Sequence, residues 1–346
     1  MIFQNITSMI GRTPVVQIRS FGPGAAHDIY LKLEGANPGA SIKDRAALGL
    51  ILDAERKGLL KPGATLVEST SGNLGKSLAM IGCARGYRVV LVMDVKVTPS
   101  VVAFCRAFGA VIDMIDEPDE TGSYQKPRLR RVKQLLAEIP DAYWPNQYDN
   151  PANPAVHEAT TAKEIIGDLP DLDYLVASVS TGGHLSGVAR AIKRARPSAQ
   201  VIAVDALGSS VFGFPYQPFL LNGIGLAWTP GNVDLRAVDE VSLVRDADAY
   251  SACRLLAQRD GVLIGGSGGA VLFTCLALAA RRPGKILGIA ADTGANYLDT
   301  IYNDQWIADH GIELVDQPAA LVARARAAEL IPSRDVPMRQ AAVRAP

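Results

Sequence analysis

Three glycine- and hydroxyl-rich turns and one lysine are the parts of this sequence that could carry chemistry. The turns read STSGN (residues 69–73), STGGH (180–184) and GGSGG (265–269), and each follows a short apolar run and precedes a helical pattern. Glycine lets backbone N–H groups approach an anion, and the N-terminus of a helix adds a partial positive charge. One such turn is most simply a tight turn with a helix cap, but three on one sheet edge indicate a binding site.

The lysine, Lys43, belongs to the segment NPGASIKDR (residues 37–45). Ser41 is a suitable N-cap residue and Asp44 follows three positions later, as in a capping box, so we expect Lys43 in the first turn of a helix. A cation there opposes the helix dipole, which suggests that the lysine serves as an amine. Taken alone, a solvated surface lysine is the simpler interpretation. Beside a phosphate-binding turn, however, it is the group that a cofactor held as a Schiff base requires.

Two nucleotide-binding interpretations are disfavoured. The tripeptide Gly75-Lys76-Ser77 is similar to the end of a P-loop, but that motif needs a glycine where this chain has Thr70. The pattern G-x-G-x-x-G is absent, which argues against a dinucleotide enzyme. Lys plus Arg and Asp plus Glu both number 35, so the composition gives no reason to expect nucleic acid as a partner.

The rest of the composition is typical of a cytoplasmic globular protein. The chain has 346 residues, 48% of them hydrophobic, and 32 glycines. Its four cysteines are widely spaced without a C-x-x-C pair, so we expect reduced thiols and no metal site. The first residues do not resemble a signal peptide. Residues 262–280 carry no charge, but their glycines favour a strand, a turn and a buried helix over a membrane span.

Short β-branched runs alternate with helical patterns along the chain, which predicts parallel sheets covered by helices on both faces. The expected strands are residues 65–67, 89–93, 111–115, 174–179, 201–204, 262–264 and 286–290, and a helix is expected at 101–108 and after each glycine-rich turn. Ligands of such sheets lie at the carboxyl ends of the strands, where the three turns are found.

Six segments, in order, resemble the cysteine synthase family of pyridoxal 5'-phosphate (PLP) enzymes of fold type II. They are IGRTPVVQI, LKLEGANPGASIKDR, ESTSGNLG, STGGHLSG, NGIG and IGGSGGA, within residues 5–310. The resemblance implies an α/β fold of two domains, each with a largely parallel sheet flanked by helices, like the tryptophan synthase β-subunit. Residues 1–12 and 35–147 would form a smaller, mobile domain, residues 13–34 and 148–325 a larger one, and residues 326–346 a tail. A cytoplasmic homodimer that binds amino-acid substrates is also implied.

The resemblance also implies a role for each matching residue. Lys43 would be the catalytic lysine that holds PLP, Asn73 would bind the ring hydroxyl of PLP, and Ser267 would face its ring nitrogen. The remaining matches are the phosphate loop, Ser180, Thr181, Gly182, Gly183 and His184, and the substrate residues Ser69, Thr70, Ser71, Gln147 and Gly223.

Several positions depart from the usual family pattern. Ser180 and His184 stand where the phosphate loop usually has Gly and Thr, and Tyr148 stands where Phe is usual. Tyr124 and Arg128 are spaced i, i+4 on one expected helical face. These features resemble the branch of the family that joins O-phospho-L-serine to L-glutamate, through an α-aminoacrylate intermediate, towards 2,3-diaminopropionate and siderophores. Arg128 would then bind the phosphate of the substrate, and Tyr148 and Ser180 would bind glutamate.

Two alternatives stay open. One is a sulfhydrylase that uses O-acetylserine or O-phosphoserine with sulfide. The other is a non-catalytic regulator that binds PLP or an amino acid, although Lys43, Asn73 and Ser267 argue against it. His27, His157 and His310 lack the spacing of metal ligands and are interpreted as surface or capping residues.

Overall fold

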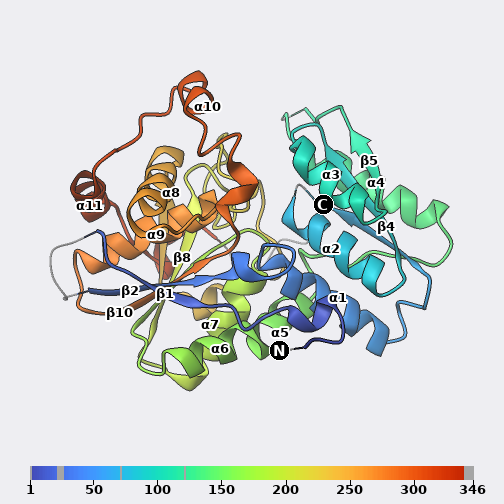
Figure 1. Ribbon diagram of the computed structural model, residues 1–346, viewed down its shortest axis with the longest axis horizontal. Helices are drawn as coiled ribbons and strands as arrows, with labels where there is room; N and C mark the ends of the chain where they lie inside the picture. The colour runs from blue at the N-terminus through green and yellow to red at the C-terminus, as the bar shows by residue number, and fades with distance from the viewer. Residues whose placement is uncertain (1, 22–26, 71, 121, 339–346) are drawn as a thin grey trace.

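The computed structural model describes residues 2–21, 27–70, 72–120 and 122–338. Two sheets, each with helices against it, stand beside one another (Figure 1). The α/β architecture predicted from the sequence is therefore confirmed.

The larger sheet has seven strands in the order β1-β2-β10-β7-β8-β9-β11. Its inner strands are parallel, and only β1 and β11 at the two edges run antiparallel to their neighbours. Inner strands covered on both faces read as continuous apolar runs, as in β8, where every residue after Gln200 is buried. The strands are β1 (Val15–Ile18), β2 (His27–Leu33), β7 (Tyr174–Ser178), β8 (Gln200–Ala206), β9 (Glu240–Val244), β10 (Gly284–Ala290) and β11 (Ile331–Pro332).

Helices cover both faces of this sheet. In Figure 1, α8 and α9 lie on one side of the strands and α5, α6 and α7 on the other. The helices are α5 (Ala152–Ala159), α6 (Thr161–Asp168), α7 (Gly183–Ala195), α8 (Asp246–Asp260), α9 (Gly266–Ala279), α10 (Asp304–Asp309) and α11 (Pro318–Ala327). Every residue of α9 is buried in the core. None of the helices in the described ranges is long and apolar enough to cross a membrane.

The smaller sheet has four parallel strands in the order β5-β4-β3-β6. The strands are β3 (Thr65–Ser69), β4 (Arg88–Asp94), β5 (Val111–Ile115) and β6 (Ala142–Tyr143), and the helices are α2 (Asn73–Ala84), α3 (Pro99–Ala107) and α4 (Gln125–Glu138). Helix α1 (Lys43–Arg56) packs against α2 on one side and α5 on the other, so it connects the two halves of the molecule.

Two local predictions were wrong. Residues 262–264 do not form a strand, because only Ile264 pairs with another segment, through a single bridge to Thr293. Ser41 is not the N-cap of α1, because its backbone pairs with Asp292 and Ile42 takes the N-cap position. Asp44 closes no capping box; its carboxylate accepts hydrogen bonds from Gly39 N and the Ser77 hydroxyl, both at 2.5 Å.

Candidate active site

A cavity of about 320 Å³ lies at the carboxyl ends of strands from both sheets. Its lining includes eleven of the residues singled out from the sequence: Lys43, Thr70, Asn73, Arg128, Gln147, Tyr148, Ser180, Thr181, His184, Gly223 and Ser267. Ser69, Gly182 and Gly183 are sequence neighbours of lining residues but do not line the cavity themselves. Ser71 falls outside the described residues.

Lys43 is the first residue of α1, and its backbone N–H donates to the Ser41 hydroxyl at 3.2 Å. Its half-buried side chain opens into the cavity. Loss of hydration lowers the pKa of Lys43 to about 8, although the carboxylate of Asp292 opposes this shift. The amine is therefore far closer to its neutral, nucleophilic form at neutral pH than an exposed lysine is.

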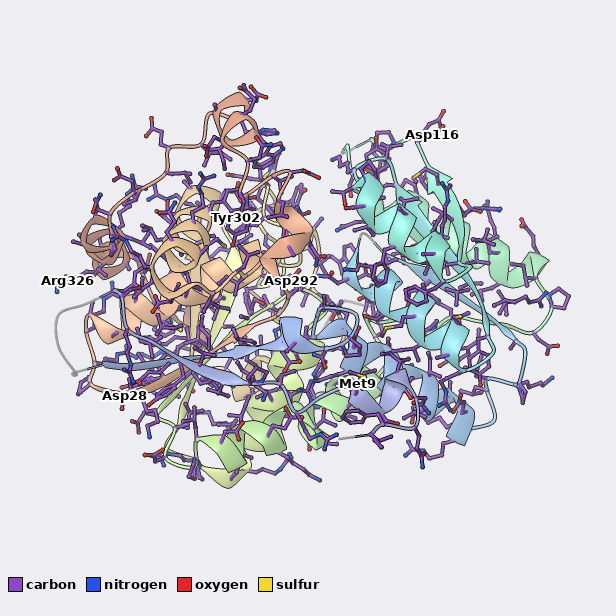
Figure 2. All side chains as sticks on the ribbon, in the orientation of Figure 1. Met9, Asp28, Asp116, Asp292, Tyr302 and Arg326 are labelled. Carbon is purple, nitrogen blue, oxygen red and sulfur yellow. The ribbon has the colours of Figure 1, made fainter. Side chains whose placement is uncertain are left out.

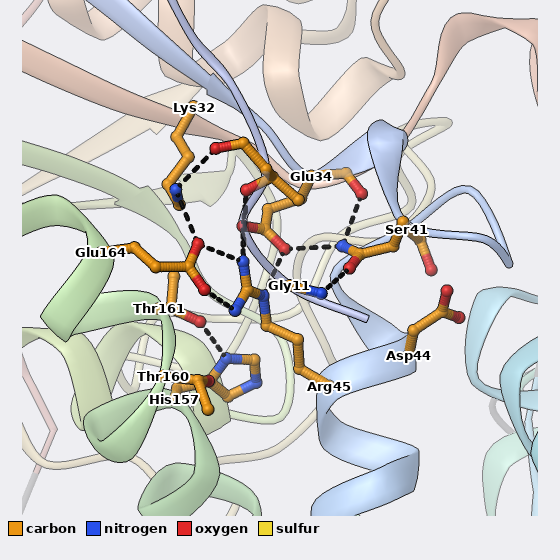
Figure 3. Close-up of polar contacts among 12 residues, drawn as sticks. Gly11, Lys32, Glu34, Ser41, Asp44, Arg45, His157, Thr160, Thr161 and Glu164 are labelled. Carbon is orange, nitrogen blue, oxygen red and sulfur yellow. Dashed lines mark hydrogen bonds and ion pairs between the residues drawn. The ribbon is translucent and has the colours of Figure 1, made fainter. Parts of the chain in front are cut away.

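A buried ion network holds the start of α1 in place (Figure 3). Arg45 donates through Nε to Glu34 Oε2 at 2.8 Å and through Nη1 to Glu164 Oε1 at 2.6 Å. Lys32 Nζ lies 2.9 Å from Glu164 Oε2, so two cations and two carboxylates balance. These contacts join α1 to β2 and α6, two residues beyond Lys43, and so they fix where the amine emerges.

The first glycine-rich turn is braced by hydrogen bonds of its own residues. The Thr70 hydroxyl accepts from the N–H groups of Gly72 and Gly75, both at 3.2 Å, and thus caps α2. Gln147 donates through Nε2 to the carbonyl oxygen of Ser69 at 3.2 Å. The N-terminus of α2 consequently faces the cavity in a fixed orientation, with Asn73 as its first residue.

The second turn leads into α7, and its close packing requires glycine. Gly182 has φ +83°, and a Cβ there would lie 2.7 Å from Val233 N. A Cβ on Gly183 would lie 2.0 Å from Asn153 Oδ1. The turn therefore brings backbone N–H groups and a helix N-terminus to the cavity, an arrangement that suits a phosphate.

His184 follows directly in α7 and is buried. Desolvation, followed by the charge of Lys43, lowers the pKa of His184 to about 3, so the imidazole is neutral. Its Nε2 has no hydrogen-bond partner among the described residues, although it lies beside the cavity. His157, interpreted from the sequence as a surface or capping residue, is instead buried, with Nδ1 3.0 Å from the Thr161 hydroxyl. That interpretation was wrong because α5 packs face to face with α7.

Arg128 and Tyr148 also line the cavity. Arg128 is only 4% exposed, and its Nη1 lies 3.3 Å from Asp94 Oδ2. Its Nε has no hydrogen-bond partner among the residues that the structure describes. Tyr148 is buried and packs against Trp228 at a ring-centroid distance of 5.2 Å.

Asp292 is a site residue that sequence reasoning missed. It lies between the two halves of the molecule (Figure 2) and lines the cavity. Its Oδ2 accepts from Asn73 Nδ2 and from the Tyr297 hydroxyl, both at 2.6 Å, and burial raises the pKa of Asp292. The sequence did contain a signal for Asp292, because it lies two residues after the predicted strand at residues 286–290, at the carboxyl edge where ligands bind.

Comparison with known proteins identifies the family. Residues 6–292 match the family described as pyridoxal-phosphate dependent enzyme. The chain belongs to this family. It is 40% identical over 311 residues to N-(2-amino-2-carboxyethyl)-L-glutamate synthase from Ralstonia nicotianae, covering 89% of this chain and 92% of the relative. The enzyme of the same name from Cupriavidus metallidurans is 40% identical over 314 residues, with the same coverage.

Solved structures of related enzymes have the same fold. O-ureido-L-serine synthase superposes with a TM-score of 0.81 at 35% identity, covering 89% of this chain and all of that one. O-acetyl serine sulfhydrylase isoform 3 from Entamoeba histolytica gives a TM-score of 0.84 at 30% identity, covering 94% and 96%. The chain is thus a PLP-dependent synthase of the β-replacement type with fold type II, and the regulator alternative is set aside.

The cavity fits this cofactor. The N-termini of α2, α7 and α9 all contribute lining residues, and the lining offers a half-buried amine. His184 Nε2 and Asp292 Oδ1 are buried and have no hydrogen-bond partner in the described part of the chain, so they offer further polar contacts for a ligand.

Proposed function

We propose that this enzyme joins O-phospho-L-serine to L-glutamate and forms N-(2-amino-2-carboxyethyl)-L-glutamate and phosphate. The observation that carries this proposal is that two curated relatives, each 40% identical over 89% of the chain, are both named for that product. The product would feed 2,3-diaminopropionate and siderophore synthesis. The enzyme would work in the cytoplasm as a homodimer, with residues 1–12 and 35–147 as the mobile smaller domain.

The cofactor would be held by groups from both halves of the cavity. When bound, PLP supplies an electron-withdrawing ring that lets Cα of an amino acid lose its proton and Cβ lose its leaving group. The Lys43 amine would hold PLP and move the proton at Cα. Asn73 would contact the ring hydroxyl, Ser267 the ring nitrogen, and residues 180–184 the phosphate. Because a serine hydroxyl does not keep the ring nitrogen protonated, the electron demand would be mild, which suits elimination and replacement.

The two substrates would use the remaining site residues predicted from the sequence. Ser69, Thr70 and Ser71 would hold the carboxylate of phosphoserine, with Gln147 bracing the loop, and Arg128 would approach its phosphate. Tyr148, Ser180 and Gly223 would receive glutamate, whose neutral amine attacks Cβ after phosphate has left. Exclusion of water from the cavity would favour attack by this amine over hydrolysis.

A sulfhydrylase activity is the second candidate, and one observation favours it. Asp94 lies 3.3 Å from Arg128 and offsets the charge that would select a phosphate leaving group. A structural relative is also named as an O-acetyl serine sulfhydrylase. Such an enzyme would need only a small nucleophile and no glutamate-binding groups.

Product identification separates these candidates. The PLP-loaded protein is incubated with phosphoserine or acetylserine, each combined with glutamate or sulfide, and the products are identified by mass. The proposal expects the glutamate adduct from phosphoserine. Cysteine as the only product, or acetylserine as the better substrate, would contradict it.

A further inference from the structure

Lys76 is a buried cation that has no role in the proposed mechanism. It lies one turn into α2, three residues after Asn73, and is only 5% exposed. Its Nζ donates to Asn296 Oδ1 at 2.9 Å and lies 4.6 Å from the centroid of the Phe104 ring. It forms no ion pair within 4.0 Å among the described residues.

A chain of hydrogen bonds leads from Lys76 to the cavity. Asn296 Nδ2 donates to Asn73 Oδ1 at 3.3 Å, and Asn73 Nδ2 donates to Asp292 Oδ2 at 2.6 Å. Asn73, Asn296 and Asp292 all line the cavity, whereas Lys76 lies behind them. Each hydrogen bond in this series is therefore donated in the direction from Lys76 towards Asp292.

The chemistry of Lys76 sets that direction. An ammonium group has donors only, so Asn296 must turn its oxygen towards Lys76. The Asn296 amide nitrogen then faces Asn73, which must accept through Oδ1. Asn73 is left with Nδ2 on the side of Asp292 and the cavity. Asp292 accepts from Asn73 Nδ2 and favours the same orientation of Asn73. Without a donor-only neighbour, however, the Asn296 amide could flip, because the two ends of an amide have nearly the same shape, and its oxygen would then face Asn73 Oδ1.

We propose that Lys76 is a positioning residue that fixes the amide of Asn73, so that its donor Nδ2, and not its acceptor Oδ1, is offered to the ring oxygen of PLP. That ring oxygen is an acceptor when it is ionised, and a flipped amide would place an acceptor against it. The inference rests on the proposed placement of Asn73 beside the cofactor. It does not depend on which nucleophile the enzyme uses.

The test measures the affinity of the cofactor-free protein for PLP, by titration, together with the visible absorption maximum of the loaded protein. We expect Lys76→Met to weaken PLP binding about tenfold or more, the usual effect of one lost hydrogen bond to a charged group. The absorption maximum should shift in the same direction as in Asn73→Ala. In an Asn73→Ala background, Lys76→Met should change PLP affinity less than about twofold, because the two residues act through one contact.

Asn296→Asp separates positioning from simple structural support. The new carboxylate would pair with Lys76, so thermal stability should be kept, but it would present only acceptors to Asn73 and force the amide to flip. We therefore expect weakened PLP binding and a shifted absorption maximum in a stably folded variant. Lys61→Met, which removes an exposed lysine, is the control and should bind PLP like wild type.

The outcomes separate two statements: that Lys76 positions Asn73, and that Asn73 lies beside the cofactor. Asn73→Ala with wild-type affinity for PLP would overturn that placement and the inference with it. Weak binding by Asn73→Ala combined with wild-type binding by Lys76→Met and Asn296→Asp would overturn the inference alone. If Lys76→Met lowers PLP affinity equally in the wild-type and Asn73→Ala proteins, Lys76 acts independently of Asn73 and the inference is overturned.

Discussion

At the scale of single residues, burial changes what the lining groups of the cavity can do. It lowers the pKa of Lys43 to about 8 and that of His184 to about 3, so the site offers an amine close to neutrality and a neutral imidazole. The carboxylate of Asp292 opposes part of this lowering of the pKa of Lys43. An amine close to neutrality is suited to proton transfer at carbon, because the pKa of an efficient general base lies near the working pH.

Lys43→Ala should abolish turnover. The substitution removes both the group that holds the cofactor and the group that moves the Cα proton. The loss should exceed the roughly 10²–10⁴-fold typical of one acid–base residue. Steady-state assays with saturating PLP measure the effect, and retention of a tenth of the wild-type rate without an added amine would refute the assignment.

Ser180→Gly and Tyr148→Phe should slow the second half-reaction and spare the first. Glutamate is a dianion, so its recognition needs hydrogen-bond donors. Ser180 and Tyr148 each bring a hydroxyl-bearing side chain to the cavity lining. Each lost hydrogen bond to a charged group corresponds to about 1.5–3 kcal/mol, or roughly ten- to a hundred-fold in that step. Stopped-flow absorbance follows phosphate elimination and glutamate addition separately. Wild-type rates of addition in both variants would show that these residues only pack.

At the scale of elements, α1 is held by charges that are buried or mostly buried. Arg45, Glu34, Glu164 and Lys32 connect α1 with β2 and α6, which belong to distant parts of the chain. Breaking such a network by removing one partner leaves another charge buried and unpaired, which is the costly case for a buried ion pair.

Arg45→Met should destabilise the fold by about 3–5 kcal/mol, because Glu34 and Glu164 would lose their cation. Arg194→Met is the matched control, since Arg194 is 60% exposed and pairs with Glu158 at the surface. That control should cost less than about 1 kcal/mol. Chemical denaturation of both variants measures the difference. Equal free energies of unfolding for the two variants would mean that the buried network contributes no more to stability than a surface ion pair does.

The same network predicts a response to acid. Burial alone would raise the pKa of Glu164. The hydrogen bond and charge of Arg45 outweigh this effect and lower that pKa from its usual 4.5 to about 2. A depressed carboxyl pKa adds stability that is complete above the unfolded value and is lost as pH falls. Melting temperatures of wild type and Glu164→Gln should thus differ most above pH 4.5 and converge towards pH 2. A difference that does not depend on pH would contradict this.

Elements with a repeating local pattern were predicted well from the sequence. Features that depend on contacts between distant parts of the chain were not. The apolar runs at β3, β4, β7, β8 and β10 were found because strands covered on both faces have no polar side. The edge strand β5, which has no buried residue, was found by its β-branched residues alone. Residues 262–264 look similar but lack a neighbouring strand, which only the fold reveals. The glycine-rich turns gave six of the eleven predicted residues that line the cavity. The pairing of Arg128 with Asp94 depends on α4 packing beside β4, which no local pattern records.

At the scale of the whole molecule, the cavity exists because two parallel sheets present their carboxyl edges to one space. The smaller sheet brings Thr70, Asn73 and the residues of α4, and the larger brings the turns that begin α7 and α9. Each half alone would carry only part of the site. The proposed motion of the smaller half would then open and close the cavity without disturbing the turns of the larger sheet.

The most direct test of the proposed reaction is one competition experiment. The PLP-loaded enzyme is given phosphoserine with equal concentrations of nitrogen-15-labelled glutamate and sulfide, and the products are analysed by mass spectrometry. The proposal predicts N-(2-amino-2-carboxyethyl)-L-glutamate that carries the label, with one phosphate released for each molecule formed. Unlabelled cysteine as the main product would contradict it and identify the enzyme as a sulfhydrylase.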